Sequence, residues 1–341
     1  MQPATSDTAT TIAVARYRFS FRMLAPLALP TFAGSLLRGQ FGAALRRVSC
    51  MTGEKDCTPC PLRVTCPYPA IFEHPAPGTH GHLKVTQAPN PYVVEPPPLH
   101  TPSLAAGDTL QFCIVLIGRA IDQLPLISFA LQRALQTGIG RERANGELIE
   151  IAWQDTSNPA PAADPADPAN PADPPQYTFT PIWLAGNAAI APHAPRINMT
   201  PPLHSTEAIT LQLHTPMRLQ HQGSPVQAHQ LTPRKLVADL LRRITLLAEF
   251  HADQHDLIPN APDLVRHAEA LEHHPSLRWQ DWSRYSSRQQ QRMTLGGALG
   301  EWQLRGELSP LLPWLQLGQW LHVGKNATMG MGHYTLQTGN T

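Results

Sequence analysis

The chain has 341 residues, and its 26 basic and 25 acidic side chains give a formal net charge of +1. This length allows one large domain or two ordinary ones with a sizeable buried core. Because the charges nearly cancel, the chain as a whole is not a polycation, and a surface for a polyanion would have to be a local cluster of basic residues. Such an excess occurs over 278–292, where four arginines face one aspartate.

The N-terminal residues 1–15 are polar and lack the basic start and long apolar segment of a signal peptide. No later apolar run is long enough to span a bilayer. The sequence therefore predicts a cytoplasmic protein without a membrane anchor. Five cysteines in a reducing compartment favour metal binding over disulfides.

Hydrophobic spacing predicts the elements of the N-terminal half. Alternating apolar and polar residues over 12–24 predict a strand, and the three-to-four spacing after Pro30 predicts a helix over 31–47. A strand over 109–118, a helix over 124–137 and a strand over 147–153 follow.

Two segments of this half are rich in proline. Residues 89–102 contain too many prolines for a central strand and are expected to form an extended surface connection. The low-complexity segment 155–176 is expected to be the tip of a long hairpin, in which 177–184 pairs with 147–153.

The C-terminal half repeats the same order of elements. We expect a strand over 208–213, a helix over 232–251 with Thr232 as its N-cap, and a hairpin of 279–293 with 297–307. A helix and a short strand, 333–336, end the chain. The order predicts an α+β protein of two tandem ferredoxin-like βαββαβ units, 1–200 and 201–341.

Cys50, Cys57, Cys60 and Cys66 form the most specific local cluster, spaced C-x6-C-x2-C-x5-C. Four thiolates within one short segment suit a closed tetrahedral zinc site, which would be structural because no coordination position stays open. The C-x2-C-x5-C part also resembles cluster-binding segments of some nucleases, so an iron–sulfur cluster is the alternative. Cys113 lies in an apolar run and is expected in a core strand.

The C-terminal sequence V-G-K-x-A-T-x-G-x-G-x-Y, residues 323–334, resembles the glycine-rich signature of the RAMP superfamily. Within that superfamily the chain is most similar to the CRISPR precursor-RNA-processing endoribonucleases. The stretches 282–289, 295–300 and 36–46 also match, and the four-cysteine cluster would make this chain a variant. The resemblance implies CRISPR repeat RNA as substrate, guide RNA as product, and other effector subunits as further partners.

The reaction that the resemblance implies needs no metal cofactor. The 2′-hydroxyl attacks the neighbouring phosphate and leaves a 2′,3′-cyclic phosphate, with the cut on the 3′ side of a repeat hairpin. This chemistry needs a base, an acid and cations near the phosphate. The candidate catalytic residues are His251, Tyr285 and His322, and the candidate RNA-binding residues are Arg38, Arg284, Arg288, Arg292, Gly324, Lys325, Gly330 and Gly332.

The sequence departs from the family pattern at one point, and this leaves alternative functions open. The predicted helix 31–47 has no histidine, although relatives place the catalytic one there. The chain could therefore be a RAMP subunit of an effector complex that binds RNA without cutting it. A third alternative is a metal-stapled interaction protein that merely uses this scaffold.

Overall fold

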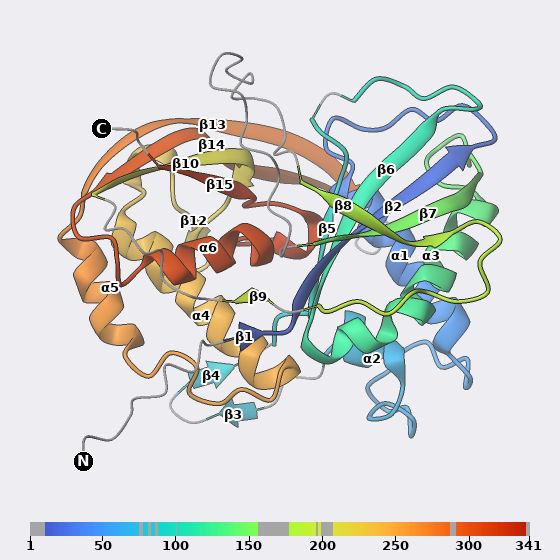
Figure 1. Ribbon diagram of the computed structural model, residues 1–341, viewed down its shortest axis with the longest axis horizontal. Coiled ribbons are helices and arrows are strands. Elements are labelled where there is room, and N and C mark those ends of the chain that lie inside the picture. The colour runs from blue at the N-terminus through green and yellow to red at the C-terminus, as the bar shows by residue number, and fades with distance from the viewer. Residues whose placement is uncertain are drawn as a thin grey trace.

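The computed structural model describes residues 11–74, 78–80, 83–85, 88–99, 101–155, 177–195, 197–198, 207–286 and 291–338. Two units, each an antiparallel sheet with helices against it, lie side by side (Figure 1). The N-terminal unit is drawn blue to green, and the C-terminal unit gold to red. The predicted α+β architecture of two ferredoxin-like units is confirmed.

The N-terminal unit has the strand order β5-β6-β2-β7-β8. Its sheet and main helices appear along the chain as β2 (Val14–Met23), α1 (Gly34–Ser49), β5 (Tyr92–Glu95), β6 (Thr109–Ile117), α3 (Leu124–Thr137), β7 (Gly146–Gln154) and β8 (Phe179–Leu184). The first four strands in chain order form the ferredoxin-like sheet, and β8 adds a fifth by pairing with β7, as predicted.

The C-terminal unit has the strand order β13-β14-β10-β15. Its elements are β10 (Ala208–Met217), α4 (Pro233–His251), α5 (Ala261–Glu269), β13 (Glu272–Ser286), β14 (Gln291–Arg305), α6 (Leu312–Leu321) and β15 (Tyr334–Thr338). Helix α4 begins as predicted, because the hydroxyl of Thr232 accepts a hydrogen bond from the backbone N–H of Lys235.

Smaller elements complete the described chain. They are β1 (Thr11–Ile12), α2 (Pro67–Phe72), β3 (Gly78–His80), β4 (Leu83–Val85), η1 (Gly118–Gln123), β9 (Ile197–Asn198), β11 (Gln220–His221), β12 (Ser224–Pro225), η2 (Ala228–Gln230) and η3 (Ala327–Met329). No helix in the described ranges is both long enough and apolar enough to cross a membrane. Most of the predicted hairpin tip, 156–176, lies outside these ranges.

Two predicted elements are wrong in detail. The segment 89–102 is not only a surface connection, because Tyr92–Glu95 forms the buried edge strand β5. Its prolines flank these four residues and interrupt none of their hydrogen bonds.

The turn of the C-terminal hairpin is also misplaced by the sequence, since β13 and β14 extend to Ser286 and Gln291. Residues 294–296, which the prediction placed between the two strands, lie inside β14. A Cβ at Gly297 would come within 2.7 Å of the carbonyl oxygen of Met217, so this glycine permits close approach of two strands.

One hydrophobic core runs through both units. Val14, Val93 and Val115 of the N-terminal sheet belong to the same cluster of buried side chains as Ile209 and Leu321 of the C-terminal unit. The two sheets are therefore joined by packing and not only by the connecting chain.

Candidate nucleic-acid interface at the glycine-rich loop

Two segments far apart in the sequence meet at the glycine-rich loop (323–333). Phe32 precedes α1, Leu295 lies on β14, and Met329 and Met331 belong to the loop, and these four side chains form one small buried cluster. Leu295 and the loop belong to stretches that carry the family resemblance, and Phe32 lies four residues before the stretch 36–46. The contact thus assembles the candidate interface.

The first turn of α1 rests directly on the loop. A Cβ at Gly34 would overlap the carbonyl oxygen of Met329, so only glycine permits this approach. On its other side the loop lies against β5, where a Cβ at Gly330 would come within 2.6 Å of the carbonyl oxygen of Val94. The loop is therefore clamped between α1 and β5.

The glycines of the loop have a different role from the one predicted. Gly324, Gly330 and Gly332 all have positive φ, between 74° and 91°, which disfavours any side chain. Gly330 and Gly332 are buried, and a Cβ at Gly332 would overlap the carbonyl oxygen of Val323. The prediction that these two glycines face RNA is wrong, because protein backbone already occupies the space beside them.

Lys325 is the exposed cation of the loop. Its backbone N–H donates to the carbonyl oxygen of Arg218 over 2.8 Å, and the Arg218 guanidinium donates to the carbonyl oxygen of Gly296 over 2.9 Å. Arg218 thereby ties the loop to β14. Sequence reasoning missed this arginine, and no local pattern distinguishes it from other arginines.

Arg38 lies on α1, one turn after Gly34. It is half-buried, its guanidinium stacks 4.4 Å above the ring of Phe72, and its Nε is buried without a hydrogen-bond partner. Gly39 beside it is exposed, and a Cβ there would meet nothing within 4 Å. The predicted open approach beside Gly39 is thus present.

The remaining predicted RNA contacts belong to the β13–β14 hairpin. The backbone pairs Arg284 with Met293 and Tyr285 with Arg292 near the end of the hairpin. The side chains of these residues and all of Arg288 lie outside the described part of the chain. The hairpin end extends beyond Ala298, the last β14 residue that pairs with β10.

His322, a predicted catalytic residue, is fully buried at the junction of the two units. Its Nε2 lies 3.0 Å from Oε1 of Glu95 on β5. The same carboxylate accepts two hydrogen bonds from the guanidinium of Arg16, at 2.8 and 2.9 Å. Arg16 also donates to the carbonyl oxygen of Gln319, so an ion pair from one unit holds the end of α6 in the other.

The electrostatics of this junction depend on Arg16. Burial by itself would raise the pKa of Glu95, but the adjacent Arg16 charge, helped by the hydrogen bond from His322, holds that pKa well below its usual range. Burial lowers the pKa of His322. Nε2 of His322 faces the ionised Glu95 carboxylate, and its Nδ1 lies 3.3 Å from the carbonyl oxygen of Met331.

Two further histidines, which sequence reasoning did not single out, extend this cluster toward the surface. The ring of His333 stacks on His322 with centroids 4.7 Å apart, and half-buried His214 lies 5.2 Å from His333. Burial lowers the pKa of His214 to about 4 and that of His333 well below its usual value. Both are therefore neutral near pH 7.

Glu95, His322 and His333 have ligand atoms within 4.8 Å of one another, the spacing of a cation site. The Glu95 carboxylate, however, already accepts three hydrogen bonds, two of them from Arg16. A divalent cation here would lie beside a buried guanidinium that has no other carboxylate partner among the described residues. The geometry therefore favours an ion-pair network over a metal site.

His251, the other predicted catalytic histidine, ends α4 and is only 4% exposed. Its Nε2 lies 2.7 Å from the carbonyl oxygen of Pro89, and His74 packs edge-on against its ring. Burial lowers its pKa to about 4. The prediction that His251 faces a cleft where RNA could reach it is wrong, because the N-terminal unit covers it.

The four clustered cysteines lie at the other end of α1, in the loop that connects it to α2, and line a common cavity. The 16 residues of α1 separate this cavity from the glycine-rich loop by roughly 24 Å along the helix axis. The fifth, Cys113, lies on β6 as predicted.

Comparison with known proteins agrees with this geometry. The family model of the CRISPR-associated endoribonuclease Cas6 matches residues 211–334, and a model described as an N-terminal domain matches 12–167. The chain has no match among curated proteins.

Solved structures resemble the whole chain. The Cas6 product complex of Thermus thermophilus has a TM-score of 0.55 and 16% identity, over 95% of this chain and 99% of that one. A Cas6-RT-Cas1–Cas2 complex has a TM-score of 0.53 and 15% identity, over 97% of this chain and 47% of that one. At these identities the likeness speaks for the fold. The C-terminal unit therefore matches the Cas6 endoribonuclease family, and the chain as a whole has the fold of the solved Cas6 structures.

Proposed function

We propose that this protein is an endoribonuclease that binds CRISPR repeat RNA in the cytoplasm and cuts it into guide RNA. The observation that carries the proposal is the meeting of α1, the β13–β14 hairpin and the glycine-rich loop in one cluster. Residues 211–334, which contain two of these three segments, match the Cas6 endoribonuclease family.

The interface contains basic residues although the chain as a whole has a net charge of only +1. Lys325 is exposed, and the hairpin adds Arg284, Arg288 and Arg292 from the sequence. Such cations would neutralise phosphates of a folded repeat, whose A-form stem is recognised mainly through its backbone and shape. Within the hairpin segment 278–292 the four arginines are opposed by one acidic residue, Asp281.

For the chemistry we propose metal-independent cleavage. The 2′-hydroxyl loses its proton and attacks the adjacent phosphorus, the bond to the 5′-oxygen breaks, and that oxygen takes up a proton. Since His251 and His322 are buried at the junction, Tyr285 is the remaining predicted catalytic residue, and we assign its phenol to supply the proton to the leaving oxygen. Lys325 and the hairpin arginines would stabilise the charge on the phosphorane.

The test is incubation of the purified protein with repeat RNA in excess EDTA. We expect one cut and a product that ends in a 2′,3′-cyclic phosphate. A substrate with 2′-hydrogen at the cut site should bind equally well and stay intact. A strict requirement for magnesium, or cleavage of the deoxy-substituted RNA, would contradict the mechanism.

A second candidate function is a non-catalytic RNA-binding subunit of a CRISPR effector complex. It is favoured by α1, which lacks a histidine, and by the burial of His251 and His322. Binding of the repeat RNA without any product over hours would select this candidate. Its stable association with guide RNA and with other effector subunits would then be measured by copurification.

A further inference from the structure

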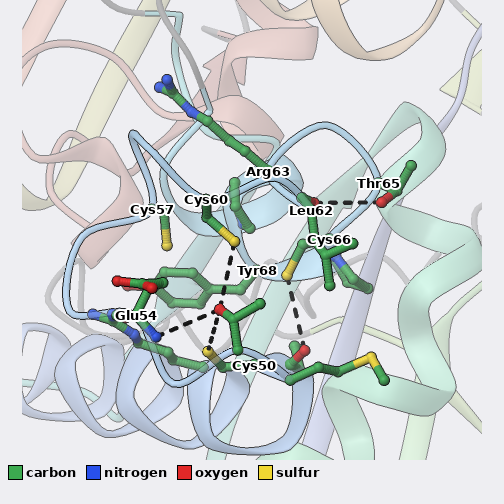
Figure 2. A pocket seen from close by; sticks show the side chains of 15 residues that line it. Cys50, Glu54, Cys57, Cys60, Leu62, Arg63, Thr65, Cys66 and Tyr68 are labelled. Carbon is green, nitrogen blue, oxygen red and sulfur yellow. Dashed lines mark hydrogen bonds between the residues drawn. The ribbon is translucent and has the colours of Figure 1, made fainter.

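Four cysteines surround one small cavity in the loop between α1 and α2 (Figure 2). Cys50 and Cys60 approach the cavity from opposite sides, with their sulfurs 4.0 and 3.5 Å from the hydroxyl of Thr52. Cys57 and Cys66 lie to either side of Cys60. None of the four is in a disulfide.

The loop that holds these cysteines, 50–66, has turns but no apolar core of its own. Consecutive turns are closed by backbone hydrogen bonds from Cys60 to Cys57, from Arg63 to Cys60 and from Cys66 to Leu62. Its apolar side chains are turned outward instead of inward, with Met51 88% and Val64 90% exposed. Since ordering such a loop costs conformational entropy that burial does not offset, something else must stabilise it.

The cysteines are placed where a bound centre would join two helices. Cys50 is the C-cap of α1 and Cys66 is the N-cap of α2. Arg46, whose charge would offset the net negative charge of four thiolates around a metal, lines the cavity together with Glu54 and Arg63. Arg46 in addition donates to the carbonyl oxygen of Lys55 and so holds the loop onto α1.

The spacing of the sulfurs decides between a single ion and a cluster. A tetrahedral zinc ion bonds each sulfur at about 2.3 Å and so brings all four within roughly 3.8 Å of one another. Among the described residues, only Glu95, His322 and His333 offer three ligand atoms within 4.8 Å of each other, so no three of these sulfurs do. The four cysteines are among the fifteen residues that line a cavity of about 180 Å³.

We infer that Cys50, Cys57, Cys60 and Cys66 bind an iron–sulfur cluster, which fills the cavity and fixes the loop between α1 and α2. In such a cluster each cysteine binds an iron atom at the rim of the inorganic core, so the sulfurs lie further apart than around one ion. This differs from the zinc site that the sequence favoured. The cluster has a structural role, and RNA cleavage does not depend on its redox state.

The loop 50–66 is also connected to the RNA interface through α2. Helix α2 places Phe72 against Gly42 of α1 and beneath the guanidinium of Arg38. Loss of the cluster would free the start of α2 and with it the contact that positions Arg38. Arg38 lies on the same helix as Gly34, which supports the glycine-rich loop.

The full-length protein, purified without oxygen, provides the first test. We expect a brown protein with iron and acid-labile sulfide in equal amounts, two or four of each per chain, and little zinc by elemental analysis. If the cluster is lost during preparation, ferrous iron and sulfide should restore the same content under reducing conditions. One zinc per chain that iron and sulfide do not replace would overturn the cluster, and a protein that takes up neither would overturn the site.

Variants locate the cluster. The double substitution Cys57→Ser and Cys60→Ser should abolish iron and sulfide uptake, whereas Cys113→Ser, a matched change on β6, should keep the full content. Circular dichroism of each variant checks that the sheets remain folded. If the double variant misfolds, the iron, sulfide and zinc content of the wild-type protein still tests the cluster. An unchanged iron content in the folded double variant would overturn it.

Discussion

Arg16 connects the two units through a single side chain. It starts on β2, pairs with Glu95 on β5, donates to the carbonyl oxygen of Gln319 and lies 4.4 Å from the ring centroid of Trp320. Both charges of the pair are buried, so each depends on the other for the solvation that water no longer supplies. The ion pair therefore maintains the junction only while both charges are present.

Glu95→Gln tests this dependence with a side chain of almost the same shape. The substitution leaves the Arg16 charge buried without its counter-ion, and we expect a loss of about 3–5 kcal/mol in the free energy of unfolding. Urea unfolding followed by tryptophan fluorescence measures the change.

Glu147→Gln is the matched control, since it breaks the Arg22 ion pair, in which both side chains are about half exposed. It should cost at most about 1 kcal/mol. Equal losses for both variants would show that the buried network contributes no more than a surface pair.

Lys325→Ala tests the proposed RNA surface. The side chain is exposed and only its backbone is held, so stability should change by at most about 0.5 kcal/mol. Repeat-RNA binding should weaken, and the slope of log affinity against log salt should fall by about one unit. Fluorescence anisotropy over a range of salt concentrations measures both.

Arg266→Ala removes another exposed charge, on α5, where among the described residues Arg266 pairs with Asp263, and should leave RNA binding and its salt dependence unchanged. Identical RNA binding by the Lys325→Ala variant and the parent at every salt concentration would exclude Lys325 from the interface.

At the scale of elements, α1 matters because its two ends have different tasks. Its first turn supports the glycine-rich loop, and its last residue precedes Cys50. Two glycines of this helix differ in their surroundings: Gly34 touches the Met329 backbone, and Gly39 touches nothing within 4 Å of where a Cβ would be. Substituting each of these two glycines by alanine distinguishes the effect of helix propensity from the effect of the contact between α1 and the glycine-rich loop.

Gly34→Ala should destabilise the protein by about 1–3 kcal/mol, because the new methyl group forces α1 away from the loop. RNA cleavage should slow in the same variant. Gly39→Ala should instead stabilise by about 0.5–1 kcal/mol, since alanine has the higher helix propensity and the space is open. Thermal and urea unfolding compare the two, and stabilisation by both would contradict the described contact.

At the scale of the whole molecule, the junction contains buried histidines that stay neutral. The groups near His251 are His74, Arg119 and Arg243, all of which oppose a positive charge on it. Its pKa is lowered from about 6.5 to about 4 in the folded protein, as is that of His214. Between about pH 4 and about pH 6.5, these two histidines are therefore more protonated in the unfolded chain than in the folded protein.

Stability should therefore fall on acidification from about pH 6.5 to about pH 4, by up to about 1.4 kcal/mol per pH unit for each such histidine. Below about pH 4 this contribution is fully lost. Loss of Glu95 ionisation adds a further decrease only below its unfolded pKa of about 4.3, because its folded pKa is depressed. Urea unfolding at several pH values measures the slope.

His251→Gln keeps a hydrogen-bond donor near Pro89 but removes one titrating group, so its pH slope should be shallower than that of the parent. His229→Gln, at an exposed position, is the control and should keep the parental slope. A free energy of unfolding that stays constant between about pH 7 and about pH 5 would contradict the predicted linkage.

The sequence by itself determined the local elements and the resemblance to a family. The boundaries of α3 follow from its apolar spacing, the start of α4 follows from Thr232 and Pro233, and the ferredoxin-like order follows from the succession of elements. These features depend on neighbours within a few residues, which a linear pattern records. The family resemblance likewise rested on short motifs.

Only the tertiary structure decided which candidate residues are accessible. His251 and His322 lie on helix ends, which a sequence pattern leaves open to solvent, but Pro89 and Glu95 of the other unit cover them. Gly34 and Met329 touch although nearly the whole chain separates them. Burial and charge pairing at such junctions depend on which surfaces meet. The spacing of residues along the chain does not record which distant surfaces come into contact.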